Sequence, residues 1–280
     1  MAKLLEGRPI AERIKEELKK KIASLKTKPL LASILVGDNA SAQTYVKAQK
    51  KAAENLGIAY QLHQLGAGTR ENDLAAFIQR LNADKGVNGI IIQMPLPPQI
   101  DYKKISQFIL PEKDTEGMHP ANLGKIVFAQ AQILPCTCAS AMELLKETGV
   151  DLYGKEVVVV GHSEIVGKPL ALLLLAQFAT VTVCHIGTSK AGKLEDHVSK
   201  AEVLIVAVGK AGLIKGEWIK AGAIVIDVGI NRAEGKIVGD VEFTEAEKRA
   251  AYITPVPGGV GPLTVTMLMR NLVEAAQLQS

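Results

Sequence analysis

Apolar residues in the first hundred positions follow two spacings in turn, one typical of helices and one of buried strands. Between residues 9 and 25 they recur every three or four positions, which predicts an amphipathic helix with Pro9 in its first turn. The continuous apolar run 30–37, "LLASILVG", predicts a buried strand, and 41–57 predicts a second helix that ends at Gly57.

The same alternation continues up to residue 94. Residues 58–65, "IAYQLHQL", alternate as in a strand, residues 72–82 have helical spacing, and 87–94, "VNGIIIQM", form a third apolar run. Strands that alternate with helices indicate βαβ units and a mostly parallel sheet, so the pattern predicts an α/β fold.

A second α/β series follows an interruption. Prolines in "MPLPP" (94–98) break the rhythm, and residues 111–138 are predicted to be loop-like, with the domain boundary there. A helix over 140–148 then leads to strands at 156–161, 180–185, 203–209 and 223–229, the last three each preceded by a helical segment. The expected domains are 1–138 and 139–261, with a last helix at 262–277 in the final segment, 262–280.

Composition places the chain among soluble globular proteins. Of its 280 residues 48% are hydrophobic and 22% are charged, and the net charge is only +4. The one basic run, "KEELKKK" (15–21), is predicted to be the solvated face of a helix rather than a nucleic-acid site. No stretch has the length of a membrane span or the pattern of a secretory signal, and three cysteines without a C-x-x-C pair suggest reduced thiols. We therefore expect a cytoplasmic protein with no metal, membrane or nucleic-acid partner.

The stretch "VVVVGHSEIVGKPLALLLL" has the order of a dinucleotide-binding turn: strand, glycine-containing turn, helix. Gly161 and Gly167 would let the backbone approach a pyrophosphate at the helix N-terminus, although G-x-S-x-x-x-G differs from the common G-x-G-x-x-G. The next strand ends at 184–187 without the acid that binds NAD or the Arg that binds NADP, and His162 and Lys190 are the only candidate cations nearby. These residues leave the choice of nicotinamide cofactor open.

Three other stretches carry candidate chemistry, each with an ordinary structural alternative. Gln93 follows an apolar strand, at the edge of a parallel sheet where ligands bind. Asp114, Glu116 and His119 lie on one loop, whose carboxylates could bind a metal or a heterocycle with several N–H donors. The glycine-rich "TPVPGGVGPLT" (254–264) could close over a ligand.

These stretches together resemble a known family. In order, "VGDNASAQTYV", "GIIIQMPLPPQID", "KDTEGMHPANLGK", "VVVVGHSEIVGKPLALLL", "GAIVIDVGIN" and "TPVPGGVGPLTVTML" are similar to the methylenetetrahydrofolate dehydrogenase/methenyltetrahydrofolate cyclohydrolase (FolD) family over nearly the whole chain. The resemblance implies a folate-binding catalytic domain and a Rossmann-like NAD(P)-binding domain, with the active site in the cleft between them. It also implies a homodimer, and a final helix that packs back on the N-terminal domain.

Within the resemblance, one departure concerns the stretch "YVKAQKK" (45–51). The family has Tyr-x-x-x-Lys on this helix, with both side chains on the face toward the folate. Tyr45 matches, but Gln49 stands at the lysine position, and Lys47 and Lys50 point elsewhere on the helix. In the family the lysine helps to activate water for hydrolysis, and a neutral amide cannot exchange a proton in that way. Hydride transfer depends mainly on positioning, so cyclohydrolase activity is predicted to be weak or absent while dehydrogenase activity remains.

Two more departures concern folate and cofactor binding. Glu116 stands where the family has the aspartate that binds the pterin. Its side chain is one methylene longer, and we expect it to hydrogen-bond the pterin ring as well. NADP-using relatives have an arginine where this chain has His162 and a serine where it has Ile186. Without that permanent cation and hydroxyl, NAD is favoured over NADP.

The sequence therefore predicts an NAD(P)-dependent methylenetetrahydrofolate dehydrogenase. The alternatives are a bifunctional dehydrogenase/cyclohydrolase, a catalytically inactive folate- and nucleotide-binding partner, and a different Rossmann dehydrogenase. The expected catalytic residues are Tyr45, Gln49, Gln93 and Glu116. The expected folate-binding residues are Tyr45, Gln93, Pro95, Leu96, Glu116, Pro257, Gly258 and Gly259. The expected cofactor-binding residues are Gly161, His162, Ser163, Ile165, Gly167, His185, Ile186, Val208, Gly209 and Ile230.

Overall fold

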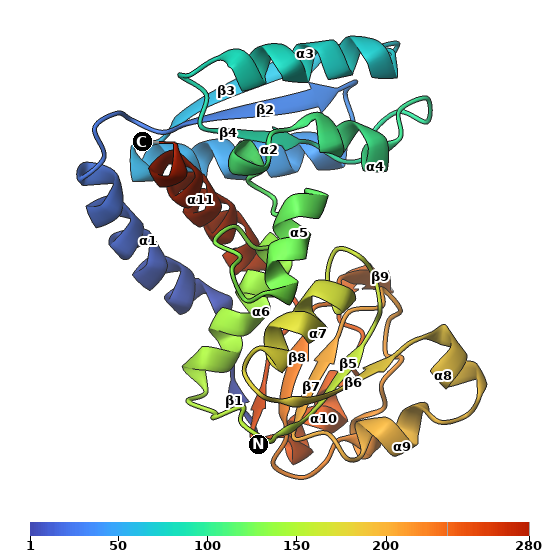
Figure 1. Cartoon of the computed structure of the whole chain (residues 1–280). Helices are drawn as coiled ribbons and strands as arrows, with labels where there is room; N and C mark the ends of the chain where they lie inside the picture. Colours follow the sequence, from blue (N-terminus) through green and yellow to red (C-terminus); the bar gives the residue numbers. More distant parts are fainter. Residues whose placement is uncertain (234, 280) are drawn as a thin grey trace. The chain divides into compact units, whose positions relative to one another are not determined.

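The computed structural model describes residues 1–233 and 235–279, which form two compact units with a sheet in each (Figure 1). The six-stranded unit comprises Met1–Glu12 and Thr137–Thr264, and the three-stranded unit comprises Arg13–Cys136 and the chain from Val265 onward. The α/β class with two domains is thereby confirmed.

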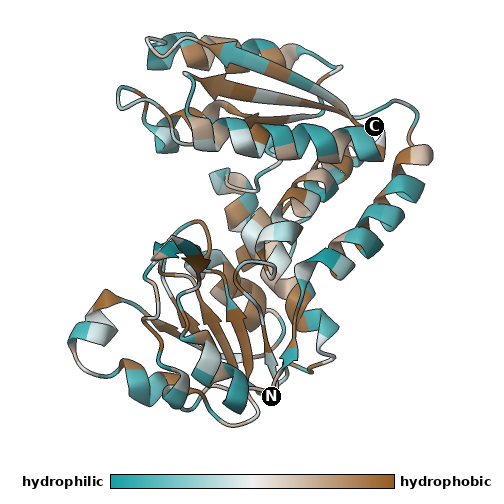
Figure 2. Ribbon diagram, turned by 180° about the vertical axis from the view of Figure 1, so that it is seen from behind, coloured by the Kyte–Doolittle hydropathy of each residue, from teal (hydrophilic) through white to brown (hydrophobic). Residues whose placement is uncertain are grey.

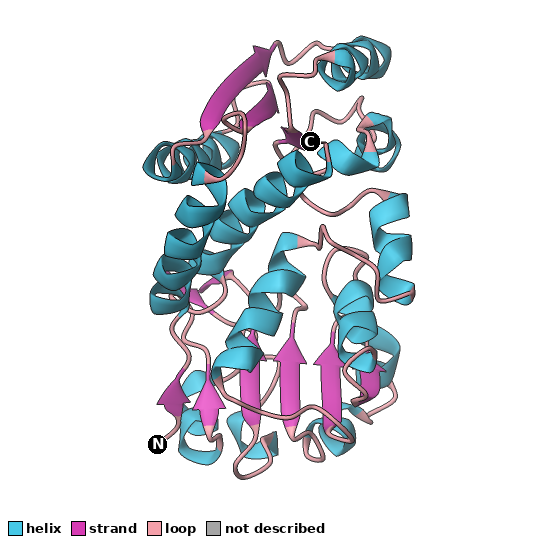
Figure 3. Ribbon diagram, turned by 60° about the vertical axis from the view of Figure 1, so that its left-hand side comes forward, coloured by secondary structure: helices cyan, strands magenta, loops and turns pink. Residues whose placement is uncertain are grey.

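The six-stranded unit contains a parallel sheet in the order β1-β11-β8-β7-β5-β6 (Figure 3). Its strands are β1 (Lys3–Leu4), β5 (Glu156–Val160), β6 (Thr180–Cys184), β7 (Val203–Val206), β8 (Ile224–Asp227) and β11 (Tyr252–Ile253). The chain runs from β5 outward to β6 and then returns to place β7 on the other side of β5. This reversal is a topological switch point, where doubly wound folds bind their ligands.

Short elements complete this unit. Its helices are α7 (Gly167–Leu175), α8 (Ile186–Lys190), α9 (Leu194–Val198), α10 (Phe243–Arg249) and the 3₁₀ helix η3 (Gly216–Trp218). A small antiparallel pair is formed by β9 (Asn231–Ala233) and β10 (Lys236–Val238). The helix expected before β8 is therefore only a single 3₁₀ turn, and the sequence did not predict the β9–β10 pair.

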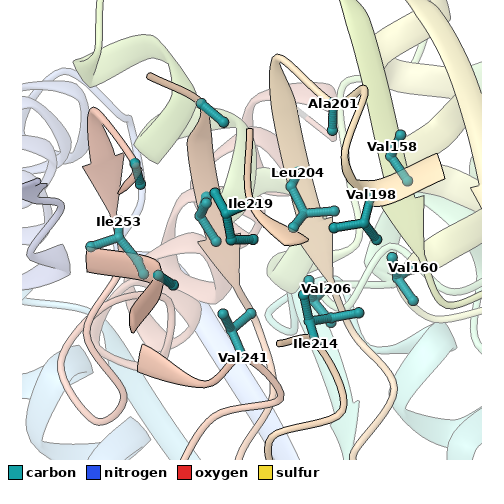
Figure 4. Close-up of a cluster of buried hydrophobic side chains, with 14 of the residues drawn as sticks. Val158, Val160, Val198, Ala201, Leu204, Val206, Ile214, Ile219, Val241 and Ile253 are labelled. Carbon is teal, nitrogen blue, oxygen red and sulfur yellow. The ribbon is translucent and has the colours of Figure 1, made fainter. Parts of the chain in front are cut away.

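One face of the six-stranded sheet holds a continuous apolar core (Figure 4). Val158, Val160, Leu204, Val206 and Ile253 point from three strands toward side chains of the connecting segments. Figure 2 shows the strands mostly in the hydrophobic colour, while the helices also carry hydrophilic residues. Parallel strands covered on both faces are expected to be apolar throughout, which explains why these runs were easy to find in the sequence.

The three-stranded unit contains the parallel sheet β3-β2-β4. Its strands are β2 (Leu30–Val36), β3 (Ala59–Leu65) and β4 (Gly89–Ile92). Its helices are α2 (Ala40–Leu56), α3 (Glu71–Ala83), α4 (Tyr102–Ile105), α5 (Pro120–Val127) and the 3₁₀ helices η1 (Ser106–Phe108) and η2 (Pro111–Lys113). Asn39 caps α2 at its start, accepting the N–H groups of Ser41 and Ala42, and Gly57 ends it with a left-handed backbone at φ 75°.

Three helices contain residues of both units: α1 (Gly7–Ala23), α6 (Cys136–Glu147) and α11 (Gly261–Leu278). From Val265 onward α11 belongs to the three-stranded unit, where Asn271 Nδ2 donates to the carbonyl oxygens of Thr115 (2.9 Å) and Leu134 (2.8 Å). Residue 280 of the expected final segment lies outside the described residues.

Two expectations differ from this arrangement. Residues 1–12 belong to the six-stranded unit rather than to a domain spanning 1–138, because β1 forms a parallel pair with β11. The supposed loop 111–138 contains α5, which begins with Pro120 in its first turn and His119 as its N-cap. Proline suits that position, so it marks the start of a helix here and not a break.

Among the described residues, no helix is long and apolar enough to cross a membrane.

Candidate active site

A pocket of about 340 Å³ opens at the carboxyl ends of β5, β6 and β7, at the switch point of the six-stranded sheet. Six of the expected cofactor-binding residues line it: Gly161, His162, Ser163, His185, Ile186 and Val208. They come from three separate turns, and the parallel sheet brings those turns to one edge. This is the place where a doubly wound sheet binds a nucleotide.

Two glycines shape the turn between β5 and α7. Gly161 has φ 126°, and a Cβ on it would overlap the carbonyl oxygen of Ala207. A Cβ on Gly167, the first residue of α7, would overlap the carbonyl oxygen of Gly161. The backbone is therefore packed as tightly as the sequence predicted, and only glycine fits at either position. The same close packing lets a diphosphate reach the backbone N–H groups of the turn.

The polar wall of this pocket includes two histidines and a lysine but, among its lining residues, no arginine. The rings of His162 and His185 lie 5.1 Å apart, and His185 Nδ1 accepts the N–H of Gly187 at 3.0 Å. Lys210 also lines the pocket; it directly follows the expected cofactor-binding residues Val208 and Gly209 but was not itself predicted. Ile186 is 66% exposed, so it presents an apolar surface at a position where a hydroxyl would hydrogen bond to a 2′-phosphate.

A buried carboxylate, which the sequence also did not reveal, holds the wall that follows β7. Asp240 is fully buried, and its two oxygens accept the backbone N–H groups of Val208 (2.7 Å), Gly209 (3.0 Å) and Lys210 (2.8 Å). The amide of Asn231 adds a fourth bond at 2.8 Å. Gly209, expected in the cofactor site, is not among the residues that line this pocket, and it acts here as a donor to Asp240.

A second pocket of the same unit, about 380 Å³ in volume, contains most of the glycine-rich "TPVPGGVGP" segment. The expected residues Ile230, Pro257, Gly258 and Gly259 line it, together with Arg8, which was not predicted. Gly7 donates its N–H to the carbonyl oxygen of Gly258 at 2.9 Å, so the segment is tied to the start of α1. Two further expected residues, Ile165 and Gly167, line neither pocket.

In the three-stranded unit, four side chains join in one buried polar network at the edge of the sheet. Gln93 follows β4, and its Nε2 donates to Gln49 Oε1 at 2.8 Å and to Ser33 Oγ at 3.0 Å. Gln49 Nε2 donates back to Gln93 Oε1 at 3.3 Å, and the Tyr60 hydroxyl donates to Gln49 Oε1 at 3.0 Å. The structure thus joins the two expected glutamines and adds Ser33 and Tyr60, which sequence reasoning missed.

Tyr45 lies one turn before Gln49 on α2, so both project from the same side of the helix. Tyr45 is half-buried and Gln49 is fully buried, whereas Lys47 and Lys50 are exposed, as expected for residues that keep the helix soluble. Beyond Gln93 the chain continues through a cis peptide bond between Met94 and Pro95. Leu96, in this segment, packs against the apolar core of the unit.

The two carboxylates of the loop before α5, Asp114 and Glu116, have different surroundings. Asp114 accepts N–H groups from Gly117 (3.1 Å), His119 (2.7 Å) and Asn122 Nδ2 (3.0 Å), so it holds the loop in shape. Glu116 accepts from the Tyr102 hydroxyl at 3.4 Å, and burial together with the neighbouring Asp114 charge raises its pKa to about 8. Among described residues no group of three or more His, Cys, Asp or Glu side chains could hold a metal ion.

Comparisons with known proteins decide the family. The model of the tetrahydrofolate dehydrogenase/cyclohydrolase catalytic domain matches residues 5–116, and that of the family's NAD(P)-binding domain matches residues 135–280. This chain belongs to that family. The resemblance recognised in the sequence is confirmed, and the chain is an NAD(P)-dependent dehydrogenase of the family rather than an inactive binding partner.

Individual relatives match along their whole length. The bifunctional protein FolD of Bacillus pumilus (strain SAFR-032) is 50% identical over 280 residues, 99% of this chain and 98% of that protein. The structure of the bifunctional FolD methylenetetrahydrofolate dehydrogenase/cyclohydrolase of Campylobacter jejuni is 45% identical, covers 100% of both chains and has a TM-score of 0.96. That of the Trypanosoma brucei dehydrogenase-cyclohydrolase with NADP and an inhibitor is 40% identical, covers 99% of this chain and 98% of the other, and has a TM-score of 0.92.

Proposed function

We propose that this FolD-family chain oxidises 5,10-methylenetetrahydrofolate to the 5,10-methenyl cation with NAD(P) and then hydrolyses that cation. The bifunctional names of its relatives, matched over their whole length, support this reading. They favour the bifunctional alternative over the prediction that cyclohydrolase activity is weak or absent. Gln49 makes hydrolysis the slower of the two reactions, because the family's lysine is missing.

The residues present fit a nicotinamide dinucleotide. Gly161 and Gly167 leave no room for a side chain where the diphosphate approaches, and Ser163 helps to hold the turn by accepting the N–H of Val166 at 3.1 Å. His162, His185 and Ile186 would surround the adenosine ribose, and the pocket with Ile230 and Gly258 would border the nicotinamide. When bound, the cofactor accepts the hydride of the one-carbon bridge. The protein's own part in that step is to position the two reactants.

The folate would lie against the polar network of the three-stranded unit. Tyr45 and the Gln49–Gln93 pair would face the one-carbon bridge, and Pro95 and Leu96 would line the apolar side. Glu116 would bind the pterin ring, whose N–H groups match a carboxylate. Its raised pKa means that the carboxyl is largely protonated at neutral pH before substrate binds, so ring N–H donors would draw its proton off.

A second candidate function is the dehydrogenase alone, and one observation favours it. Gln49, Gln93, Ser33 and Tyr60 are all neutral, and their hydrogen bonds are made within the network. Burial also raises the pKa of Tyr60, so its phenol keeps its proton. None of the four groups can therefore take up a proton from water in the way that an amine can.

The cofactor proposed for this chain is NAD in preference to NADP. A 2′-phosphate is best held by a permanent planar cation with several donors, and the lining residues of the pocket include no arginine. Lys210 supplies one point charge there, which would allow weaker use of NADP. The homodimer and the cytoplasmic location stay predictions.

A product analysis tests the function. Purified protein is mixed with methylenetetrahydrofolate and either NAD or NADP, and methenyl and formyl products are followed to completion. The proposal expects methenyltetrahydrofolate to rise first and then disappear faster than in a protein-free control, with the higher kcat/KM for NAD. Methenyl product that decays only at the protein-free rate would establish the dehydrogenase alone.

A further inference from the structure

The polar network around Gln49 joins side chains from four parts of the three-stranded unit. Ser33 lies on β2, Gln49 on α2, Tyr60 on β3, and Gln93 directly after β4. Burial raises the pKa of Tyr60, and a hydrogen bond with the Ser33 side chain partly offsets that rise. The Tyr60 hydroxyl donates to Gln49 Oε1 at 3.0 Å. Gln49 Oε1 therefore accepts from both Tyr60 and Gln93, and Ser33 accepts from Gln93.

Counting donors and acceptors shows which groups remain. Gln49 Oε1 accepts two bonds, from Gln93 and Tyr60, and so uses both lone pairs. Gln93 Nε2 donates two bonds, to Gln49 and Ser33, and so uses both protons. Among the described residues, two groups of the pair have no further hydrogen-bond partner: one N–H of Gln49 Nε2 and one lone pair of Gln93 Oε1.

The two remaining groups lie on the same edge of the amide pair. Gln49 and Gln93 are joined by two bonds in opposite directions, which sets the amides edge to edge. Tyr60 and Ser33 bond to one outer edge of this pair, so the leftover N–H and lone pair share the opposite edge. A small molecule that both accepts and donates a hydrogen bond can bind to this N–H and this lone pair together. Water is the smallest such molecule.

An amide at position 49 needs an orienting partner that a lysine does not need. The three N–H groups of an ammonium are equivalent, whereas the two ends of an amide differ in polarity, and its hydrogen-bond network decides which end points where. Here the Tyr60 hydroxyl bonds to the oxygen end of Gln49. Without it, one lone pair of a buried amide loses its partner, and the opposite orientation becomes accessible.

We propose that Tyr60 is a positioning residue for hydrolysis: it fixes the Gln49–Gln93 pair so that the free edge orients the attacking water. This inference rests on the proposed function. The water oxygen bonds to the one-carbon centre of the methenyl cation, the bond from that carbon to one ring nitrogen breaks, and the carbonyl forms. One water proton ends on the released nitrogen and the other passes to solvent, which balances the loss of positive charge. The pair orients the water and takes no proton.

The test is a double-mutant cycle of Tyr60→Phe and Gln49→Lys, with the ratio of hydrolysis rate to oxidation rate as its readout. We expect Tyr60→Phe to lower this ratio about 10-fold when residue 49 is Gln, the size of one lost buried hydrogen bond. With Lys at 49 we expect a change of less than about 2-fold. Tyr153→Phe, at a residue 72% exposed in the other unit, is the matched control and should leave the ratio unchanged. An equal loss in both backgrounds, or no loss in either, overturns the inference.

A second readout separates this inference from the proposed function. If the natural chain hydrolyses no methenyl product above the protein-free rate, the proposed bifunctional activity fails. The side-chain amide signals of ¹⁵N-labelled glutamine then test Tyr60 directly. We expect Tyr60→Phe to shift the Gln49 signal and to speed the exchange of its protons with water, while circular dichroism shows the variant folded. An unchanged Gln49 signal overturns the inference, whatever the enzyme activity.

Discussion

Asp240→Asn removes half of the bonds that hold the nucleotide-pocket wall after β7, and its cost can be worked out from the structure. The two carboxylate oxygens accept four hydrogen bonds in total, from three backbone N–H groups and from Asn231. Asparagine replaces one oxygen by an NH₂ group, which would face two donors and bond to neither. Hydrogen bonds to a charged group contribute about 1.5–3 kcal/mol each. The loss of two therefore lowers the free energy of unfolding by about 3 kcal/mol at least.

Thermal unfolding and cofactor kinetics measure this effect. For a protein of this size about 3 kcal/mol corresponds to a melting temperature lower by roughly 6–12 °C. Because Val208 and Lys210 line the pocket, we also expect KM for NAD to rise about 10-fold. Asp196→Asn, at an exposed carboxylate of α9, is the control and should change neither quantity. If Asp240→Asn melts within about 2 °C of the natural chain, the Asp240 bonds do not hold this wall.

Four other substitutions, in three experiments, test the diphosphate turn, the ribose site and Glu116. Gly167→Ala places a methyl group against the carbonyl oxygen of Gly161, so we expect KM for NAD to rise more than about 10-fold; an unchanged KM would show that the turn does not approach the cofactor. The pair His162→Arg and Ile186→Ser should raise kcat/KM for NADP relative to NAD about 10-fold, and an unchanged ratio would refute the assignment of the ribose site. Glu116 has a pKa of about 8 in the folded chain, above its ordinary 4.5. Between pH 4.5 and about pH 8 the folded chain therefore binds more protons at this carboxyl than the unfolded chain does. The free energy of unfolding accordingly falls as the pH rises from 4.5 to about 8. The melting temperature of Glu116→Gln minus that of the natural chain should therefore grow from about pH 5 to about pH 9, and a constant difference would contradict the raised pKa.

The sequence revealed the parts of the fold and site that depend on local pattern. Buried parallel strands are continuous apolar runs, so β2, β5, β7 and β8 were found close to their observed bounds. The turn with Gly161 and Gly167 was found because close backbone packing demands glycine at a fixed distance after a strand. These features could be predicted without knowledge of what surrounds them.

The features that were missed depend on contacts between distant segments. Tyr60 lies in an alternating strand where any half-buried polar residue would fit, and only its bond to Gln49 gives it significance. Asp240 is one carboxylate among many until the fold brings it under residues 208–210. The pairing of β1 with β11 joins residues some 250 positions apart, and no local pattern indicates it.

Direct assay of hydrolysis tests the central claim most sharply. Purified chain is mixed with 5,10-methenyltetrahydrofolate without any nicotinamide cofactor, and loss of the methenyl compound is compared for the natural chain, Gln49→Lys and a protein-free control. We expect loss above the protein-free rate for the natural chain, and a rate about 10²–10⁴-fold higher for Gln49→Lys, the usual contribution of a general base. A natural chain that matches the protein-free control would contradict the proposal that this enzyme carries both activities.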